Sequence, residues 1–144
     1  MVTNPQALIA TLTAQHRGLQ RDLAFVSDGL KSETIQKSSV LVSQLAIFKK
    51  DLSEHLALEN GEFYPDYLHK KEVKGEDLGS TKEFIRKMDD IGKVVMGFLD
   101  TYKTPESIDV SIVTFQHELE GIIKTLNVRI ETEEEGVYGI YLVY

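Results

Sequence analysis

The sequence predicts an all-α protein, an up-down-up-down four-helix bundle that forms one domain over residues 1–144. Apolar residues recur at steps of three and four along several long stretches. Strand-like alternation is nearly absent, and Asn60-Gly61 lies between two glutamates in a helical pattern rather than between apolar runs. Of the three prolines, Pro5 and Pro105 follow residues typical of a helix N-cap. The chain's 144 residues, 42% of them apolar, suffice for one core.

The first helix is predicted from about Pro5 to about Ser27, with Asn4 as its N-cap. Asp28-Gly29 is expected to end it, because glycine adopts the left-handed conformation of a helix cap. One face carries a stripe with helical spacing: Leu8, Leu12, His16, Leu19, Leu23 and Val26.

The second helix is predicted to begin near Thr34 and to end around Tyr64-Pro65, since proline disfavours a helical residue before it. A lysine-rich loop from His69 to Gly79 is expected to cross to the third helix. The stripe of the second helix again has helical spacing: Leu41, Leu45, Phe48, Leu52, His55, Glu59 and Phe63.

The third helix is predicted to begin near Ser80 and the fourth to follow Pro105. The third stripe is Phe84, Met88, Ile91, Val95, Phe98 and Tyr102. The fourth stripe is Ile112, Phe115, Leu119, Ile122, Leu126, Ile130, Glu133 and Val137. The apolar tail to Tyr144 is expected to cover the bundle end or to form a dimer contact, in a monomer or homodimer.

Composition excludes several functional classes. A net charge of -7 without a basic cluster disfavours binding to nucleic acid or to an anionic membrane. The absence of cysteine excludes disulfides, thiolate metal sites and thiol catalysis. Neither a signal peptide nor a membrane span is recognisable, so a cytoplasmic location is expected. No phosphate-binding loop, nucleophile elbow or zinc-protease motif is present, and no enzyme class is favoured.

Four polar residues interrupt the apolar stripes. At 100° per residue, His55 and Glu59 lie near the centre of their stripe, and His16 and Glu133 lie within theirs. A buried carboxylate without a partner loses its charge or costs several kcal/mol. The sequence therefore requires a metal ion, a basic side chain or a hydrogen-bond network in the core.

The two halves of the chain resemble each other. Residues 55–67 align without gaps to residues 129–141, which pairs Glu59 with Glu133 and Tyr64 with Tyr138. Two helix hairpins related by a pseudo-twofold axis would place one half-site from each hairpin at the same level of the core. Within the first, His55 and Glu59 are one turn apart on one face, as chelation of a metal requires.

These motifs resemble the hemerythrin-like, or HHE cation-binding, domains. The resemblance rests on AQHRGL in the first helix, HLALENGEFYP in the second and ETEEEGVY in the fourth. It implies a four-helix bundle that binds non-heme iron, mononuclear or di-nuclear, with roles in dioxygen or other diatomic ligand binding and in redox or iron sensing. By resemblance, the metal ligands would be His16, His55, Glu59 and Glu133.

The sequence departs from the family pattern in its second half. Met88 stands where the third helix of the family has a histidine, and Arg129 stands four residues before Glu133 where the family has another. Asp89 and Asp90 point away from the stripe and are poor substitutes. Arginine is permanently charged and does not bind metals, and thioether sulfur suits ferric iron badly. A full di-iron site is therefore disfavoured.

Two hypotheses remain open. In one, a single metal ion binds to the histidines and glutamates of an incomplete site. In the other, the bundle binds no metal and acts as an interaction or regulatory module, with Arg129 supplying the positive charge. Arg129 could pair with Glu133 or Glu59, or extend from the edge of its stripe to solvent.

The remaining candidates receive simpler interpretations. Met88 is expected to pack in the core, His117 to be exposed on the fourth helix, and His69 to lie in a loop. Tyr64 and Tyr138 are expected at the mouth of the site, each with a glutamate as hydrogen-bond partner. Of the run 133–135, only Glu133 is expected to point inward.

Overall fold

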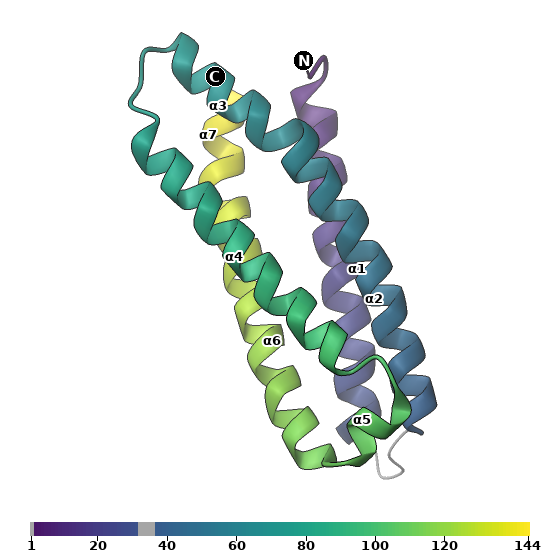
Figure 1. Cartoon of the computed structure of the whole chain (residues 1–144). Helices are drawn as coiled ribbons and strands as arrows, with labels where there is room; N and C mark the ends of the chain where they lie inside the picture. Colours follow the sequence, from purple (N-terminus) through teal and green to yellow (C-terminus); the bar gives the residue numbers. More distant parts are fainter. Residues whose placement is uncertain (1, 32–36) are drawn as a thin grey trace.

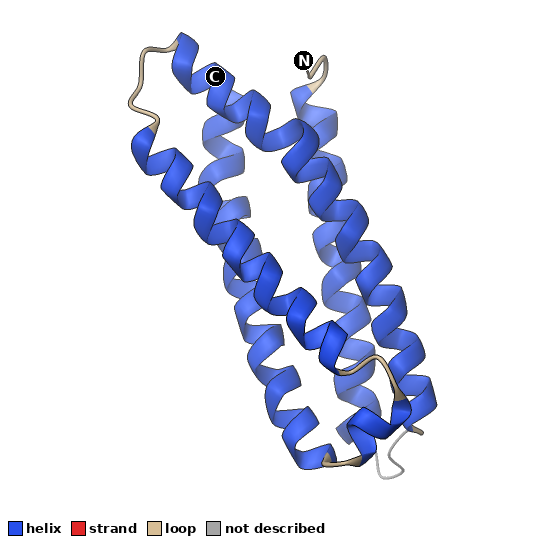
Figure 2. Cartoon of the chain, in the orientation of Figure 1, coloured by secondary structure: helices blue, strands red, loops and turns tan. Residues whose placement is uncertain are grey.

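Every regular element of the described chain is a helix. The computed structural model describes residues 2–31 and 37–144, and no strand occurs within these ranges (Figure 2). The all-α prediction is therefore confirmed for the described residues. The predicted start of the second helix near Thr34 lies outside them.

Over the described residues the longer helices run as extended rods, and two of these rods contain a short π-helical segment (Figure 1). The elements are α1 (Pro5–Lys31), α2 (Ser38–Leu58), η1 (Glu59–Phe63), α3 (Tyr64–Val73), α4 (Gly79–Thr101), α5 (Pro105–Asp109), α6 (Ile112–Thr132), η2 (Glu133–Val137) and α7 (Tyr138–Val143). Helix α1 packs against α2 and α6, and α4 packs against α6 and α2. Both termini lie at the end of the molecule opposite α5.

Helix α1 continues one turn beyond the predicted stop at Asp28-Gly29. It ends at Lys31, and Gly29 is a buried residue within the helix rather than a left-handed cap. Leu30 lies in the apolar core with 7% exposure, so burial of its side chain favours the additional turn.

The prediction that the second helix ends at Pro65 is also wrong. The backbone N–H of Tyr64 donates to the carbonyl of Glu59, five residues earlier, and Pro65 then occupies the first turn of α3, where a proline N–H is not needed. The widened turn lets the rod continue to Val73. His69 is therefore an exposed helical residue and not part of a loop. The turn that follows α3 contains Gly75, whose φ is 73°.

The third helix begins at Gly79, one residue before the prediction, but the fourth is divided. Helix α5 starts at Pro105 as expected and ends at Asp109. Ser111 then acts as a new N-cap, because its hydroxyl accepts the backbone N–H of Thr114 and begins α6.

A layer of polar side chains divides the core into two apolar clusters. One cluster extends toward α5, and its members from α1 and α6 are Leu19, Leu23, Val26, Leu30, Phe115, Leu119, Ile122, Leu126 and Ile130. The other lies toward the termini, and its members from α1 and α7 are Leu8, Ile9, Leu12, Tyr138 and Tyr141. The apolar clusters hold the rods in register, and this register fixes the height at which the polar side chains meet.

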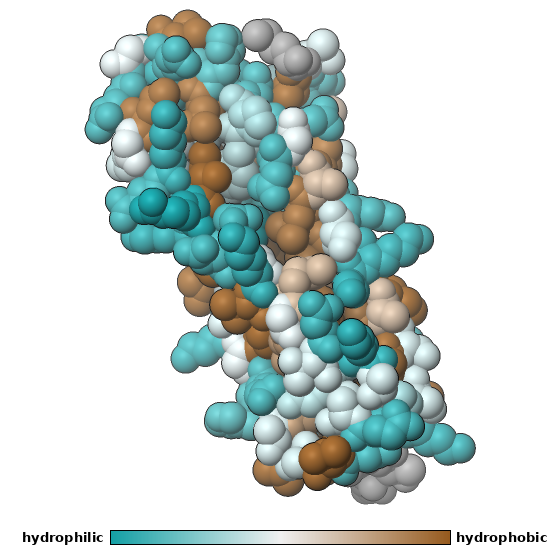
Figure 3. Space-filling view, in the orientation of Figure 1, coloured by the Kyte–Doolittle hydropathy of each residue, from teal (hydrophilic) through white to brown (hydrophobic). Residues whose placement is uncertain are grey.

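Within the described residues, no helix combines the length and apolar character that crossing a membrane would require. The surface seen in Figure 3 is mostly hydrophilic, with smaller apolar areas between polar side chains.

Candidate metal centre

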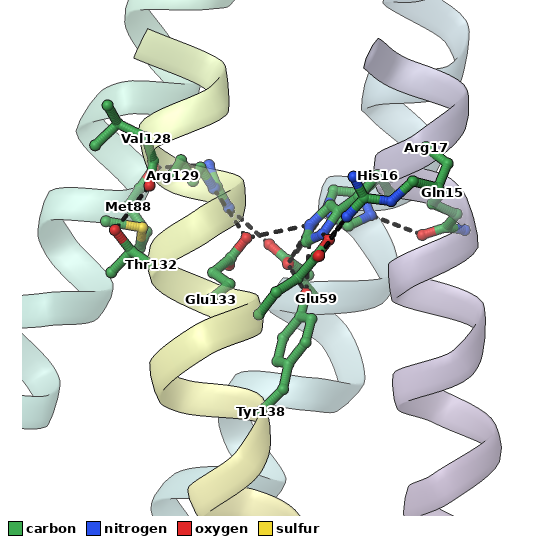
Figure 4. Close-up of polar contacts among 12 residues, drawn as sticks. Gln15, His16, Arg17, Glu59, Met88, Val128, Arg129, Thr132, Glu133 and Tyr138 are labelled. Carbon is green, nitrogen blue, oxygen red and sulfur yellow. Dashed lines mark hydrogen bonds and ion pairs between the residues drawn. The ribbon is translucent and has the colours of Figure 1, made fainter. Parts of the chain in front are cut away.

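Four buried side chains from three rods converge in the polar layer, and Figure 4 labels three of them, His16, Glu59 and Glu133. His16 comes from α1, His55 from α2, and Glu59 and Glu133 open the two π-helical segments. Each offers one ligand atom, and all four atoms lie within 4.8 Å of one another. All four residues are at most 2% exposed, so the inward orientation that helical phase predicts for them is confirmed.

Both histidines point one ring nitrogen outward and the other into the layer. The Nδ1 atoms lie 2.6 Å from Oε2 of Glu134 for His16 and 2.7 Å from Oε1 of Gln15 for His55. Carboxylate and amide oxygens only accept, so each Nδ1 carries the hydrogen. This leaves both Nε2 atoms for the interior, which is the tautomer that supports metal binding through Nε2.

The two Nε2 atoms face the two glutamates. Nε2 of His55 lies 3.1 Å from Oε1 of Glu59, one helical turn away. Nε2 of His16 lies 3.3 Å from Oε1 of Glu133 and 3.8 Å from Oε1 of Glu59. The carboxylate oxygens and the imidazole nitrogens therefore surround one common point.

Arg129 completes the layer from α6. It is 4% exposed, and its Nη2 donates to Oε2 of Glu59 at 2.6 Å. Its Nε lies 3.7 Å from Oε1 of Glu133. Of the two alternatives that the sequence left for Arg129, the structure contains the internal ion pair and not the extension to solvent. The main partner of Arg129 is Glu59, across the core.

Two tyrosines cross-link the halves reciprocally. The hydroxyl of Tyr64 donates to Oε2 of Glu133 at 2.5 Å, and the hydroxyl of Tyr138 donates to Oε1 of Glu59 at 2.9 Å. Each tyrosine thus binds the glutamate of the other half, as a pseudo-twofold arrangement requires. The expectation that both phenols have glutamate partners is confirmed.

The π-helical segments explain how a glutamate and the tyrosine five residues later face the same core. In an α-helix, five residues correspond to about 140° of rotation beyond a full turn, so one of the two would leave the core. The widened turn reduces this angle. Both segments begin at the paired glutamates, and η2 forms with Gly139 at the place of Pro65, so the proline is not required for the widened turn.

Met88 and Gly92 of α4 position the arginine. The main-chain carbonyl of Met88 accepts from Nη1 of Arg129 at 2.8 Å, while the Met88 side chain packs in the apolar cluster near the termini. A Cβ atom at Gly92 would lie 3.3 Å from Nη1. The glycine therefore allows close approach of the guanidinium to α4.

Electrostatics in the layer follow from these contacts. Burial alone would lower the pKa of His16, but Glu133 and Glu59 outweigh it and raise that pKa to about 9. Burial opposes ionisation of Glu59, yet His16, His55 and Arg129 together hold its pKa well below the usual value. Burial and the nearby Glu59 raise the pKa of Glu133. Without a metal, protonated His16 and Arg129 balance the carboxylates.

The donor set fits one metal ion but not two. Oε1 of Glu133 is buried without a hydrogen bond and lines a cavity of about 10 Å³ together with both histidines and Arg129. Such a cavity holds about one atom the size of a water oxygen. Two imidazoles and two carboxylates suit a divalent iron, manganese or zinc ion. The guanidinium occupies the neighbouring position, where a second cation would be repelled.

Three contacting residues were not identified from sequence. Glu133 is the only buried member of the run 133–135, as expected, but the half-buried Glu134 also contributes, because it contacts Nδ1 of His16 and Arg17 from the outside. Gln15 and Gly92 carry no ligand-type signal, although a glycine three residues before Val95 in an apolar stripe indicates close approach. His117, Asp89 and Asp90 are exposed, as expected.

A comparison of the sequence with known proteins identifies the family of the chain. No curated protein and no solved structure matches the chain significantly. The family model described as hemerythrin HHE cation-binding domain matches residues 7–141, which include every residue of the polar layer. The chain belongs to the hemerythrin HHE cation-binding domain family.

Proposed function

We propose that this protein is an up-down-up-down four-helix bundle that binds one non-heme metal ion, iron(II) in the first place, through His16, His55, Glu59 and Glu133. One observation carries the proposal. The four ligand atoms lie within 4.8 Å of one another, and both histidines hold their Nδ1 hydrogen on an outward acceptor.

The chemistry proposed for this site is reversible binding of dioxygen or another small diatomic molecule, as part of redox or iron sensing. A bound iron(II) ion would supply open coordination positions for such a ligand. The chain's own residues exclude water through the apolar clusters on both sides of the layer. The hydroxyls of Tyr64 and Tyr138 orient the carboxylates by donating one hydrogen bond to each.

Uptake of metal by the purified protein tests the proposal. The metal-free chain is incubated separately with iron(II), manganese(II) and zinc(II), and bound metal is measured after dialysis. We expect about one equivalent of iron per chain, because the donor set surrounds a single position. Binding of less than about a tenth of an equivalent of every metal would refute the proposal.

A matched pair of histidine variants locates the binding. His55→Ala removes an interior Nε2 and should abolish most of the uptake. His117→Ala removes an exposed imidazole of α6 and should leave the uptake unchanged. Equal loss in both variants would indicate binding at the surface instead.

A second candidate function is favoured by the 2.6 Å contact between Arg129 and Glu59. In this alternative the bundle binds no metal and acts as an interaction or regulatory module, with Arg129 and protonated His16 as the counter-charges. The two candidates differ in the melting temperature of protein isolated from iron-rich medium. A chelator should lower it if metal is bound, because the ligand stabilises only the folded state, and should leave it unchanged otherwise.

A further inference from the structure

A second, larger cavity lies directly outside the polar layer. It has a volume of about 300 Å³ and is bordered by α2 and η1 on one side and by α4 on the other. Its lining includes Leu56 and Asn60 from the first side and Gly92, Met96 and Gly97 from the second. Helices α2 and α4 are neighbours on the face seen in Figure 3, where apolar and polar side chains mix.

The outer cavity and the 10 Å³ inner cavity share two lining residues, Gly92 and Arg129. The guanidinium of Arg129 therefore forms the boundary between them. Behind this boundary, Oε1 of Glu133 lines the inner cavity, where it has ion-pair contacts with His16 and Arg129 but no hydrogen bond of good geometry. A buried carboxylate oxygen that lacks a well-formed hydrogen bond leaves room for one more polar contact at the inner end.

The charges around the outer cavity favour the entry of an uncharged molecule. The rim carries Asp89, which pairs with Lys93 at 3.1 Å, and Asp100, which pairs with Lys49 at 3.4 Å. A cation would meet the guanidinium of Arg129 at the inner end. An anion would face the carboxylates of Glu59 and Glu133 immediately beyond it.

We propose that the α2–α4 cleft is the route by which small uncharged molecules of one or two heavy atoms reach the polar layer, with Gly92 and Arg129 as its narrowest point. Gly92 contributes no side chain to this point, and an added Cβ would lie 3.3 Å from Nη1 of Arg129 and 3.6 Å from Leu56, so a larger residue there would narrow it further. The inference rests on the proposed function for the role of the arriving molecule, but not for the existence of the route.

Dissolved dioxygen tests the route in metal-free protein, because it is uncharged and paramagnetic. NMR relaxation of methyl groups is measured with and without pressurised dioxygen in the full chain. Ile130 and Leu52 report on the inner cavity, and Leu56 and Met96 report on the outer one. Gly92→Val narrows this point of the route, whereas Gly121→Val of α6 adds the same side chain away from both cavities, where nothing lies within 4 Å of a Cβ.

We expect Gly92→Val to reduce the dioxygen effect at Ile130 and Leu52 by about threefold or more, because close-packed interiors offer few other paths. The effects at Leu56 and Met96 should persist, and Gly121→Val should leave the inner methyl groups unchanged. An unchanged inner effect in Gly92→Val, or an equal reduction in Gly121→Val, would overturn the route. If the valine variant does not fold, Gly92→Ala gives the same comparison with a smaller reduction.

Metal uptake and dioxygen access are separate measurements, so the two proposals can fail independently. A chain that binds no metal but shows the predicted effect of Gly92→Val retains the route. A chain that binds one metal ion but shows no effect of Gly92→Val retains the site alone.

Discussion

At the scale of single residues, Arg129 distinguishes this site from a symmetric pair of half-sites. His55 and Glu59 in the first half correspond to Arg129 and Glu133 in the second, with the same spacing of four residues. The arginine contacts Glu59 more closely than its own neighbour Glu133, at 2.6 against 3.7 Å. A fixed positive charge thus occupies the half of the layer where a second set of ligands would be needed.

Removing this charge should destabilise the metal-free fold. Arg129→Ala leaves Glu59 without its buried counter-charge, which typically costs about 3 kcal/mol or more. Urea unfolding of metal-free protein measures the effect. Lys93→Ala, which removes an exposed ion pair with Asp89, is the control and should change the free energy of unfolding little. Equal effects of the two variants would contradict the interior role of Arg129.

Restoring histidines should restore a second half-site. In the double variant Met88→His with Arg129→His, imidazoles stand at both positions where the family pattern has histidines, and the guanidinium no longer repels a cation. We expect iron binding to rise from about one to about two equivalents per chain, because a second cluster of imidazole and carboxylate donors becomes available. Failure to gain any metal would contradict the register of α4 against α6.

A separate pair of carboxyl groups predicts a pH dependence. Partial burial and the neighbouring Asp51 raise the pKa of Asp22 to about 7, and Arg21 opposes this only in part. The folded state therefore keeps a proton that the unfolded chain loses near pH 4, so this pair lowers stability as pH rises from about 4 to about 7.

Asp22→Asn should remove that loss of stability. The free energy of unfolding of the variant should therefore exceed that of the wild-type chain by more at pH 8 than at pH 5. Free energies of unfolding in urea at both pH values measure the difference. Asp28→Asn changes an exposed aspartate of the same helix and serves as the control. An advantage of Asp22→Asn that is the same at both pH values would contradict the raised pKa.

At the scale of elements, the two π-helical segments carry the site. Each begins with a buried glutamate and is followed by a buried tyrosine, so the widened turns place two polar groups per rod on the core side. Such single widened turns often occur at functional sites. Their identical position in both halves supports the internal repeat that the sequence indicates.

Helical phase accounts for the part of the site that could be predicted from sequence. His16, His55, Glu59 and Glu133 were located by their place in apolar stripes, because those stripes record which face is buried. Pro65 was misleading, because the standard effect of proline on an α-helix does not apply after a widened turn. The contacts of Glu134 and Gln15 were not predictable, since they depend on how α1 lies against its neighbours.

The position of the turn after α3 gives a direct test of the corrected helix end. Gly75 adopts φ 73°, which disfavours any residue with a Cβ, so Gly75→Ala should destabilise the fold by about 1 kcal/mol. Gly121→Ala, in the middle of α6 with open space around a Cβ, should stabilise it by about 0.5–1 kcal/mol. Stabilisation by Gly75→Ala in urea unfolding would place the turn elsewhere.

At the scale of the whole molecule, the polar layer is supported by the two apolar clusters. The clusters fix the positions of the rods along their axes, and the π-helical segments turn the glutamates inward. Arg129 neutralises one of the two buried carboxylates, so the layer needs less positive charge from a metal ion. The account therefore predicts a bundle that stays folded without metal and gains stability when one ion binds.

Anomalous diffraction at the iron edge, from crystals of protein reconstituted with iron(II), tests the central claim most directly. The account predicts a single iron peak per chain, among His16, His55, Glu59 and Glu133, with Arg129 still bound to Glu59. The absence of a peak in this layer, or two peaks with Arg129 displaced, would contradict it.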